Sequence, residues 1–290
     1  LGYNITTANG GITCPTAVTL GGDVTVDTGR SPGGDINFSS TIDGAHSLAL
    51  LAGSASSVTV DGAIGGSNAL ATFRASGATL NMPAVTTVGN QTFEADTLNA
   101  AGNFTGAGAM TLAPYSPGTS IGVAGGSGTL NLDTTLLGRV QNGFTQLVIG
   151  RADGTGAITA NEYTTPVHFS EVSLQNGGVG SAGIALNGAL SSTGTLTLNT
   201  TGTVTQTPSV GDITAAGLEL FGTGGSYNLT NENNQIGTLA AGNTGSVNFV
   251  NNGPLTTYDL TSGGAINIMT TTGDLTIAGN INTNDATPSA

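Results

Sequence analysis

The chain has 290 residues and a formal net charge of −13, because 17 acidic residues stand against four arginines and no lysine. Nucleic-acid binding requires clustered Lys and Arg that displace counterions from phosphates, so this composition excludes a nucleic-acid-binding protein and disfavours docking on an anionic membrane. No apolar segment reaches the ~18 residues of a membrane-spanning helix, which predicts no membrane insertion. Aromatic residues make up only 4% of the chain, so Val, Ile, Leu and Ala must supply the core.

Strand-sized segments in which apolar and small polar residues alternate recur about every ten residues along the chain. Alternation places two apolar side chains on the same face of a strand. In chain order, these apolar pairs are Val24/Val26, Ile36/Phe38, Leu48/Leu50, Val58/Val60, Leu80/Met82, Leu130/Leu132, Leu147/Ile149, Ile184/Leu186, Leu196/Leu198, Leu218/Leu220, Val247/Phe249, Ile266/Ile268 and Leu275/Ile277. Helical periodicity is not sustained anywhere, so the sequence predicts an all-β protein.

A repeat this short cannot bury its own apolar face and must stack on copies of itself, as in a β-solenoid. A sandwich or barrel is the alternative for short strands, but its solvent faces usually carry more aromatic and charged residues. Outward positions here are Thr, Asn, Ser and Gly, which form ladders when strands stack in register. We therefore predict a right-handed parallel β-helix. Three segments per coil give about ten coils, in a single array over residues 1–290.

The stretch Ala113–Gly180 breaks this rhythm, because it holds Pro114, Pro117 and Pro166 and proline cannot donate to a strand ladder. We expect irregular coils or an insertion there. Insertions in solenoids often emerge on one face and bind ligands, whereas the alternative is a less regular pair of coils. The rare residue types gathered in this stretch are weak candidates for ligand contacts: Tyr115, Arg139, Arg151, Tyr163 and His168.

Parallel β-helices also include glycan-cleaving enzymes, and hydrolysis needs two carboxylates close together. The candidate carboxylates mostly lie beside Gly or at strand ends, where Asp stabilises turns. They are Asp23, Asp35, Asp61, Asp133 and Asp153. A lyase would need Lys or Arg to abstract a proton or neutralise a uronate, and the chain has only four scattered arginines. We therefore predict no catalytic, cofactor-binding or metal-binding residues.

Three further features have one structural and one functional interpretation. His168 lies between Glu162 and Glu171 and is either a general base or a solvent-facing strand residue. Cys14, the single cysteine, is either a small buried hydrophobe or an intermolecular thiol. The segment Gly150–Gly156 faintly suggests a calcium-binding turn but lacks the tandem nonapeptide of calcium-binding β-rolls.

The most specific signal lies in the segments Gly217–Asn231, Ile236–Ala241, Thr244–Phe249 and Thr271–Ile277. Over residues 210–282, this pattern resembles the degenerate repeats of filamentous-haemagglutinin-like adhesins, which Gram-negative bacteria export by two-partner secretion. The resemblance implies a right-handed β-helix, export through an outer-membrane partner, a secreted or cell-surface location, and roles in adhesion, aggregation or biofilm. The family's Asn-Pro-containing secretion motifs are not found near the start, so the resemblance places the chain in the shaft.

Together these features predict a non-catalytic segment of a bacterial adhesin that acts as a stiff rod. Its expected partners are other copies of itself, neighbouring segments of a longer adhesin, or a surface glycan or protein receptor. Assembly into extracellular filaments is a variant of this role, since exposed coil ends are templates for strand addition. The alternatives are a carbohydrate-active β-helix enzyme and a glycan- or protein-binding module with its site in residues 113–180.

Overall fold

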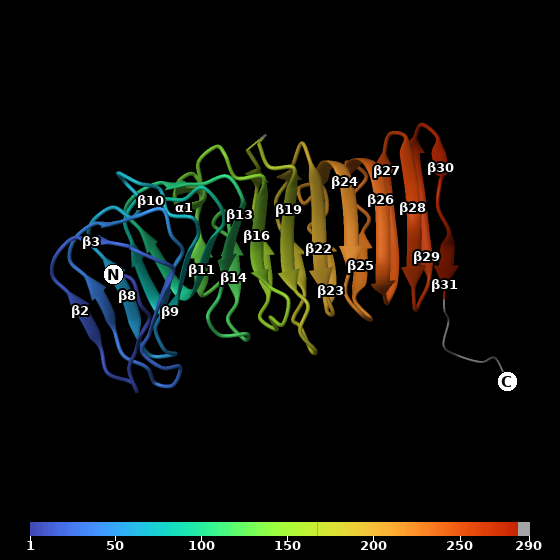
Figure 1. The fold of residues 1–290 in the computed structure, drawn as a ribbon. Coiled ribbons are helices and arrows are strands. Elements are labelled where there is room, and N and C mark those ends of the chain that lie inside the picture. The colour runs from blue at the N-terminus through green and yellow to red at the C-terminus, as the bar shows by residue number, and fades with distance from the viewer. Residues whose placement is uncertain (167, 284–290) are drawn as a thin grey trace. The chain divides into compact units, whose positions relative to one another are not determined.

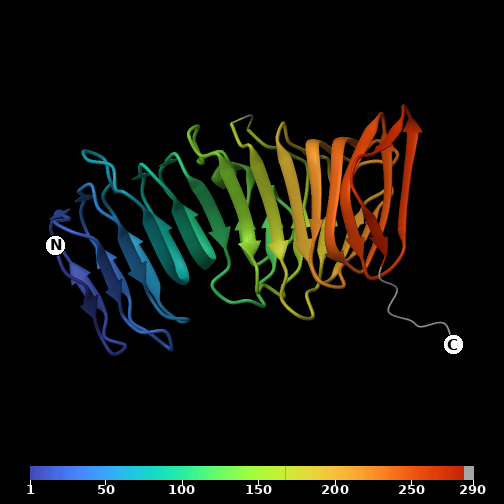
Figure 2. The same ribbon diagram turned by 45° about the vertical axis from the view of Figure 1, so that its right-hand side comes forward.

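The computed structural model describes residues 1–166 and 168–283. It is all-β with almost no helix, and its parallel strands stack into a β-solenoid of about 13 turns. Within each unit, successive strands lie side by side, as Figures 1 and 2 show. The prediction of an all-β parallel solenoid is confirmed.

The chain forms two compact units, which are described here one at a time. The first unit contains Leu1–Ser116 and Thr129–Val148, and the second contains Pro117–Gly128 and Ile149–Ala290. The chain therefore leaves the first unit after Ser116, contributes a short segment to the second, returns at Thr129, and leaves again through β16 (Gln146–Arg151). This double exchange accounts for much of the irregularity predicted in residues 113–180.

The first unit is a stack of short parallel strands with one helical turn, α1 (Thr134–Leu137). Its strands are β1 (Ile5–Thr6), β2 (Ile12–Cys14), β3 (Val18–Thr19), β4 (Val24–Asp27), β5 (Ile36–Phe38), β6 (Ile42–Asp43), β7 (Leu48–Leu51), β8 (Ser57–Val60), β9 (Phe73–Met82), β10 (Val85–Thr86), β11 (Gln91–Ala100), β12 (Phe104–Thr105), β13 (Ala109–Ala113) and β15 (Leu130–Leu132). Strand β4 pairs with β7, β7 with β9, and β9 with β11, always in parallel.

The second unit has two long ladders of parallel strands. Its strands are β14 (Ile121–Val123), β17 (Ile158–Ala160), β18 (Tyr163–Thr164), β19 (Glu171–Asn176), β20 (Ile184–Leu186), β21 (Leu190–Ser191), β22 (Thr195–Thr200), β23 (Thr203–Gln206), β24 (Ile213–Phe221), β25 (Ser226–Leu229), β26 (Gln235–Thr244), β27 (Ser246–Asn252), β28 (Leu255–Ser262), β29 (Ile266–Thr272), β30 (Leu275–Ile277) and β31 (Ile281–Thr283). One ladder runs β14–β17–β20–β23–β25–β27–β29, and the other runs β19–β22–β24–β26–β28.

The coils are shorter than predicted, which is why the solenoid has about 13 turns and not about ten. Neighbouring coils are joined by hydrogen bonds between residues 24 apart, as from Ser47 to Asp23, or 19 apart, as from Ala109 to Asn90. Three ten-residue segments per coil would have needed about thirty residues. Glycines with positive φ allow some of the corners to turn tightly. Gly222, with φ +124°, is one example, and a Cβ there would lie 2.0 Å from the Thr200 carbonyl oxygen.

Stacked apolar side chains form the core of each unit. In the second unit, Leu174 pairs with Leu198 and Leu198 with Leu220, and all three are buried. Burying a leucine contributes roughly 1.5–3 kcal/mol relative to leaving it exposed. In the first unit, the Phe93 ring lies between those of Phe73 and Phe104, with centroid separations of 5.8 and 4.6 Å. The predicted inward pairs are thus buried wherever a coil covers them on both sides.

Buried amide side chains satisfy the backbone at several corners of the second unit. Asn234 is fully buried, accepts from the Ile213 N–H at 2.8 Å, and donates to the carbonyl oxygens of Leu229 and Val250. Asn251 likewise accepts from the Ile236 N–H at 2.8 Å. A buried backbone group without a partner costs roughly 1–3 kcal/mol, so these amides stabilise the turns.

Asp and Asn side chains clamp one coil to the next. Each accepts a hydrogen bond from a backbone N–H on the following coil. The acceptors, with their donors, are Asn4 (Thr25), Asp23 (Ser47), Asp35 (Ser57), Asp43 (Ser67), Asn90 (Ala109), Asp96 (Ser116) and Asp259 (Asn280). Asp23 and Asp35 were predicted to stabilise local turns, but the hydrogen bonds of their side chains join neighbouring coils that are 24 and 22 residues apart in sequence.

The outermost coils are only half covered. In the second unit, Leu260 is fully buried, but Ile281, its partner on the last coil, is 46% exposed, and Ile277 is 59% exposed. In the first unit, Cys14 lies on β2 and is half-buried, with its free thiol 3.7 Å from the Thr16 carbonyl oxygen. The interpretation of Cys14 as a buried hydrophobe is therefore too strong, because β2 belongs to the first coil.

Replacing Phe93 with Ala is expected to lower the free energy of unfolding of the first unit by about 3–5 kcal/mol, because it empties the middle of an aromatic stack. Urea unfolding monitored by circular dichroism measures this loss. The control is Val88→Ala, whose side chain is 66% exposed and whose loss should cost under about 0.5 kcal/mol. Equal effects of the two variants would contradict the assigned core.

Replacing Asp35 with Ala is expected to cost about 1 kcal/mol, because the Ser57 N–H loses its acceptor at 2.7 Å. Asp35→Asn keeps an oxygen at the same position and should retain most of the stability. Thermal unfolding of both variants measures the difference. An Asn variant as unstable as the Ala variant would show that the charge, and not the hydrogen bond, stabilises the coil.

Candidate functional site

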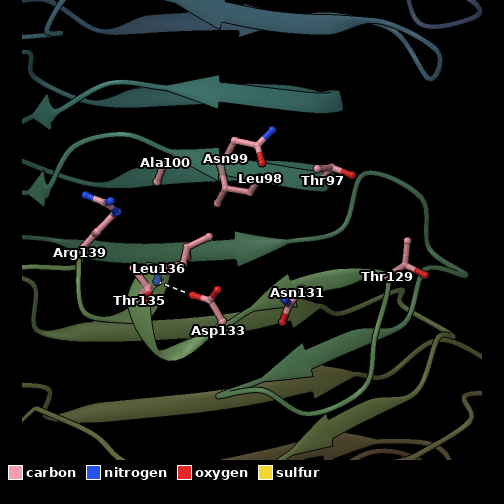
Figure 3. Close-up of a pocket in the computed structure, with 10 residues that line it drawn as sticks. All are labelled: Thr97, Leu98, Asn99, Ala100, Thr129, Asn131, Asp133, Thr135, Leu136 and Arg139. Atoms are coloured by element: carbon pink, nitrogen blue, oxygen red, sulfur yellow. Dashed lines mark hydrogen bonds between the residues drawn. The ribbon is translucent and has the colours of Figure 1, made fainter.

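A polar cleft of about 420 Å³ opens on the surface of the first unit. Figure 3 shows its lining, which comes from the second half of β11, from β15, and from α1 with the residues that follow it. The lining residues are Thr97, Leu98, Asn99, Ala100, Thr129, Asn131, Asp133, Thr135, Leu136 and Arg139. The cleft exists because a helical turn replaces a regular strand at this corner.

Strand alternation determines which side chains face the cleft. Leu98 is buried on β11, so its neighbours Thr97 and Asn99 point outward and are exposed. On β15, Asn131 is exposed between the buried Leu130 and Leu132. The strand pattern therefore presents hydroxyl and amide groups to the cleft.

The charged groups of the cleft are held by hydrogen bonds to the backbone. Asp133 caps α1, and its Oδ1 accepts from the Leu136 N–H at 2.8 Å, as the dashed line in Figure 3 marks. Arg139 donates from Nη1 to the Ala101 carbonyl oxygen at 3.2 Å. One N–H of Arg139 and one oxygen of Asp133 make these bonds, and both side chains have further hydrogen-bonding groups. These two residues provide a carboxylate and a guanidinium for a ligand.

A second cleft, of about 350 Å³, lies on the other side of Asn99. It shares Asn99 and Ala100 with the first cleft and is lined also by Thr59, Asp61 and Asn81. Asn81 donates to the Thr59 hydroxyl at 3.0 Å, and Asn99 donates to the Asn81 Oδ1 at 2.9 Å. These bonds join three coils into one polar row that crosses both clefts.

The predicted carboxylates have different roles in the structure. Asp23 and Asp35 clamp coils, and Asp61 lines the second cleft. In the second unit, Asp153 pairs with Arg151, at 2.5 Å from Nε to Oδ1 and 2.9 Å from Nη2 to Oδ2. The hydrogen-bonded Arg151 guanidinium holds the pKa of Asp153 below its usual range. Asp153 is the acidic residue of the segment Gly150–Gly156, the weak candidate for a calcium-binding turn. Both of its carboxylate oxygens bind Arg151.

The five rare residues of the irregular stretch are divided between the units. Arg139 is the one of these five that lines the cleft. Tyr115, also in the first unit, donates from its hydroxyl to the Arg30 carbonyl oxygen at 3.2 Å. In the second unit, Tyr163 is half-buried on β18, and burial raises its pKa to about 12. Arg151 pairs with Asp153 as described above.

His168 lies in the second unit with both ring nitrogens buried. Among the described residues, neither nitrogen has a hydrogen-bond partner, and no ion pair joins the ring to Glu162 or Glu171. Its ring packs against Phe169, with centroids 4.2 Å apart. Burial lowers the pKa of His168 below its ordinary value of 6.5. No carboxylate in the described part of the chain orients His168. The residue lies in a turn and not on the predicted strand, and it is half-buried with its ring against Phe169.

The thermodynamic effect of His168 is expected below pH 6.5. There the unfolded chain binds a proton that the folded chain does not, so the free energy of unfolding falls as the pH drops from about 6.5 toward the folded-state pKa. His168→Phe removes this proton uptake and should lose less stability than the wild type between about pH 7 and pH 5. Urea unfolding at both pH values measures the two slopes. Identical slopes would contradict a buried neutral imidazole.

The amide row was not singled out from the sequence, although a signal was present. The triplet Thr-Leu-Asn occurs four times in the chain. The copies at residues 79–81, 97–99 and 129–131 contribute to the clefts, whereas the copy at 197–199 lies in the second unit. Repetition of a triplet at solenoid spacing predicts stacked identical side chains. The placement of Asp133 and Arg139 depends on α1, a four-residue helix too short for sequence periodicity to reveal.

Comparisons with protein-family models, with curated proteins and with solved structures find no match to this chain. Within the described residues, no helix is long and apolar enough to cross a membrane.

Proposed function

We propose that this chain is a non-catalytic structural and adhesive segment of a secreted or surface-attached bacterial adhesin. The observation that carries the proposal is the stack of coils in each unit, in which apolar ladders lie inside and Asp or Asn clamps join neighbouring coils. In such a stack, each coil is stabilised by its neighbours, so local bending breaks several contacts at once. A stiff segment of this kind suits the shaft of an adhesin.

The resemblance to filamentous-haemagglutinin-like repeats supports the same role. Residues 210–282 correspond to the coils from β24 to β31, where strand pairing continues from one coil to the next. The role includes export through an outer-membrane partner and action in attachment, aggregation or biofilm at the cell surface.

The last coil of the second unit supports self-association as part of this function. Strands β30 and β31 pair with β28, yet Leu275, Ile277 and Ile281 are at least 40% exposed. One coil earlier, Leu255 and Leu260 are buried. A second copy of this chain that stacks on this coil would bury Leu275, Ile277 and Ile281. Strands β30 and β31 bury Leu255 and Leu260 of β28 in the same way. Such head-to-tail contacts build open filaments when the rotation between successive copies does not close a ring.

Display of this chain on a non-adherent bacterium is expected to increase both attachment to surfaces and cell–cell aggregation. Replacing Ile277 and Ile281 with Lys should reduce aggregation several-fold, because charges at the coil end oppose stacking. Attachment counts and settling rates measure the two effects. The matched control is Val179→Lys, a substitution at a side chain that is 97% exposed in the same unit.

Two outcomes would count against this function. Display without a gain in attachment or aggregation would refute the adhesive role. If Val179→Lys reduces aggregation as much as the coil-end substitutions do, the coil end is not the contact between copies. The adhesive role would then be judged from the attachment counts alone.

A further inference from the structure

Three copies of the triplet Thr-Leu-Asn meet on the surface of the first unit. The first copy, at residues 79–81, pairs in register with the second, at 97–99. The third copy, at 129–131, lines the same cleft as the second. The leucine of each copy is buried, so the threonine and asparagine of each copy face outward. The result is a small grid of hydroxyl and amide groups.

The spacing of this grid follows from the solenoid. Neighbouring strands lie about 4.8 Å apart, and alternate residues on one strand lie about 7 Å apart. The pyranose ring of a sugar is about as long as the strand spacing. A chain of sugars that runs across the strands would therefore place successive rings over successive coils.

The amides of the grid have capacity left for a ligand. In the hydrogen bonds that join Thr59, Asn81 and Asn99, each asparagine donates from one of its two N–H groups. The second N–H and the remaining carbonyl lone pairs can bind hydroxyl groups, which both donate and accept. Asn99 and Asn131 are exposed, so their amides are accessible in the cleft.

The ends and floor of the cleft add complementary groups. Asp133 can accept from sugar hydroxyls, and Arg139 can donate to them, while bonds to Leu136 and Ala101 hold both side chains in place. Leu98 and Leu136 contribute a small apolar floor, as Figure 3 shows. Preorganised groups of this kind reduce the entropy cost of binding.

We propose that this cleft, together with the amide row beside it, binds a neutral oligosaccharide. A neutral ligand fits the charge, because the first cleft holds one carboxylate, Asp133, and one guanidinium, Arg139. Asp61 adds a second carboxylate in the neighbouring cleft, and the whole chain carries a net charge of −13. An anionic glycan would meet repulsion from the carboxylates. The site goes beyond the structural role proposed above, which assigns no ligand to the coils.

The test is a microarray of neutral and sulfated oligosaccharides probed with the full chain, followed by calorimetric titration of the tightest neutral binder. Binding is expected to neutral glycans and to change little when NaCl is raised, since no charge on the ligand is screened. Asn131→Ala and Arg139→Gln should each weaken the affinity about tenfold, through the loss of hydrogen bonds to the ligand. Because Arg139→Gln changes no strand residue, it remains informative if Asn131→Ala disturbs folding.

The matched control is Asn199→Ala, which alters a fourth copy of the triplet, Thr197-Leu198-Asn199, in the second unit and should leave the affinity unchanged. The proposal is overturned if no neutral glycan on the array binds, or if sulfated glycans bind in a salt-sensitive manner. It is also overturned if Asn199→Ala weakens binding as much as Asn131→Ala. Preferential capture of extended peptides would assign the cleft to a protein partner instead. None of these outcomes bears on attachment through the coils.

Discussion

The whole structure depends on one constraint, which is that no coil can bury its own aliphatic row. Each row needs a second row above and below it, so burial in one coil is a property of its neighbours. The Leu174–Leu198–Leu220 ladder satisfies this condition on both sides, and Ile281 satisfies it on one. Register is then enforced at the corners, where Asn234 and Asn251 bind backbone groups of adjacent coils. Aliphatic stacking supplies the stability, and buried amides supply the alignment.

The same constraint leaves the outward positions available for other purposes. A residue such as Asn99 contributes one ladder bond and is otherwise unconstrained by the core. Threonine and asparagine at these positions can vary without loss of the fold, provided that the inward residues persist. Where α1 interrupts the strand pattern, the regular surface becomes a cleft with charged residues at its border. The candidate binding site of the first unit therefore lies where the repeat is irregular.

Much of the fold could be predicted from residue patterns. Pairs such as Val24/Val26 lie on one face because strand periodicity is two, and that rule depends on no distant residue. The number of coils could not be predicted, because it depends on how tightly corners such as Gly222 turn. Of the cleft, the repeated Thr-Leu-Asn triplet could have been recognised. The positions of Asp133 and Arg139 could not, because they follow from a single helical turn and its hydrogen bonds.

The exchange of segments between the units has a consequence for the order in which the chain acquires structure. Strand β14 belongs to the second unit, and its Ile121 pairs with Ile158, which comes much later in the chain. A chain that emerges amino-terminus first from a ribosome must hold Pro117–Gly128 without its second-unit partner until β17 arrives. Meanwhile Thr129–Val148 can already complete the first unit. Folding at this point cannot proceed strictly coil by coil, because residues 117–128 join the second unit only after a later part of the chain has formed. We expect a delay here between folding of the first unit and folding of the second.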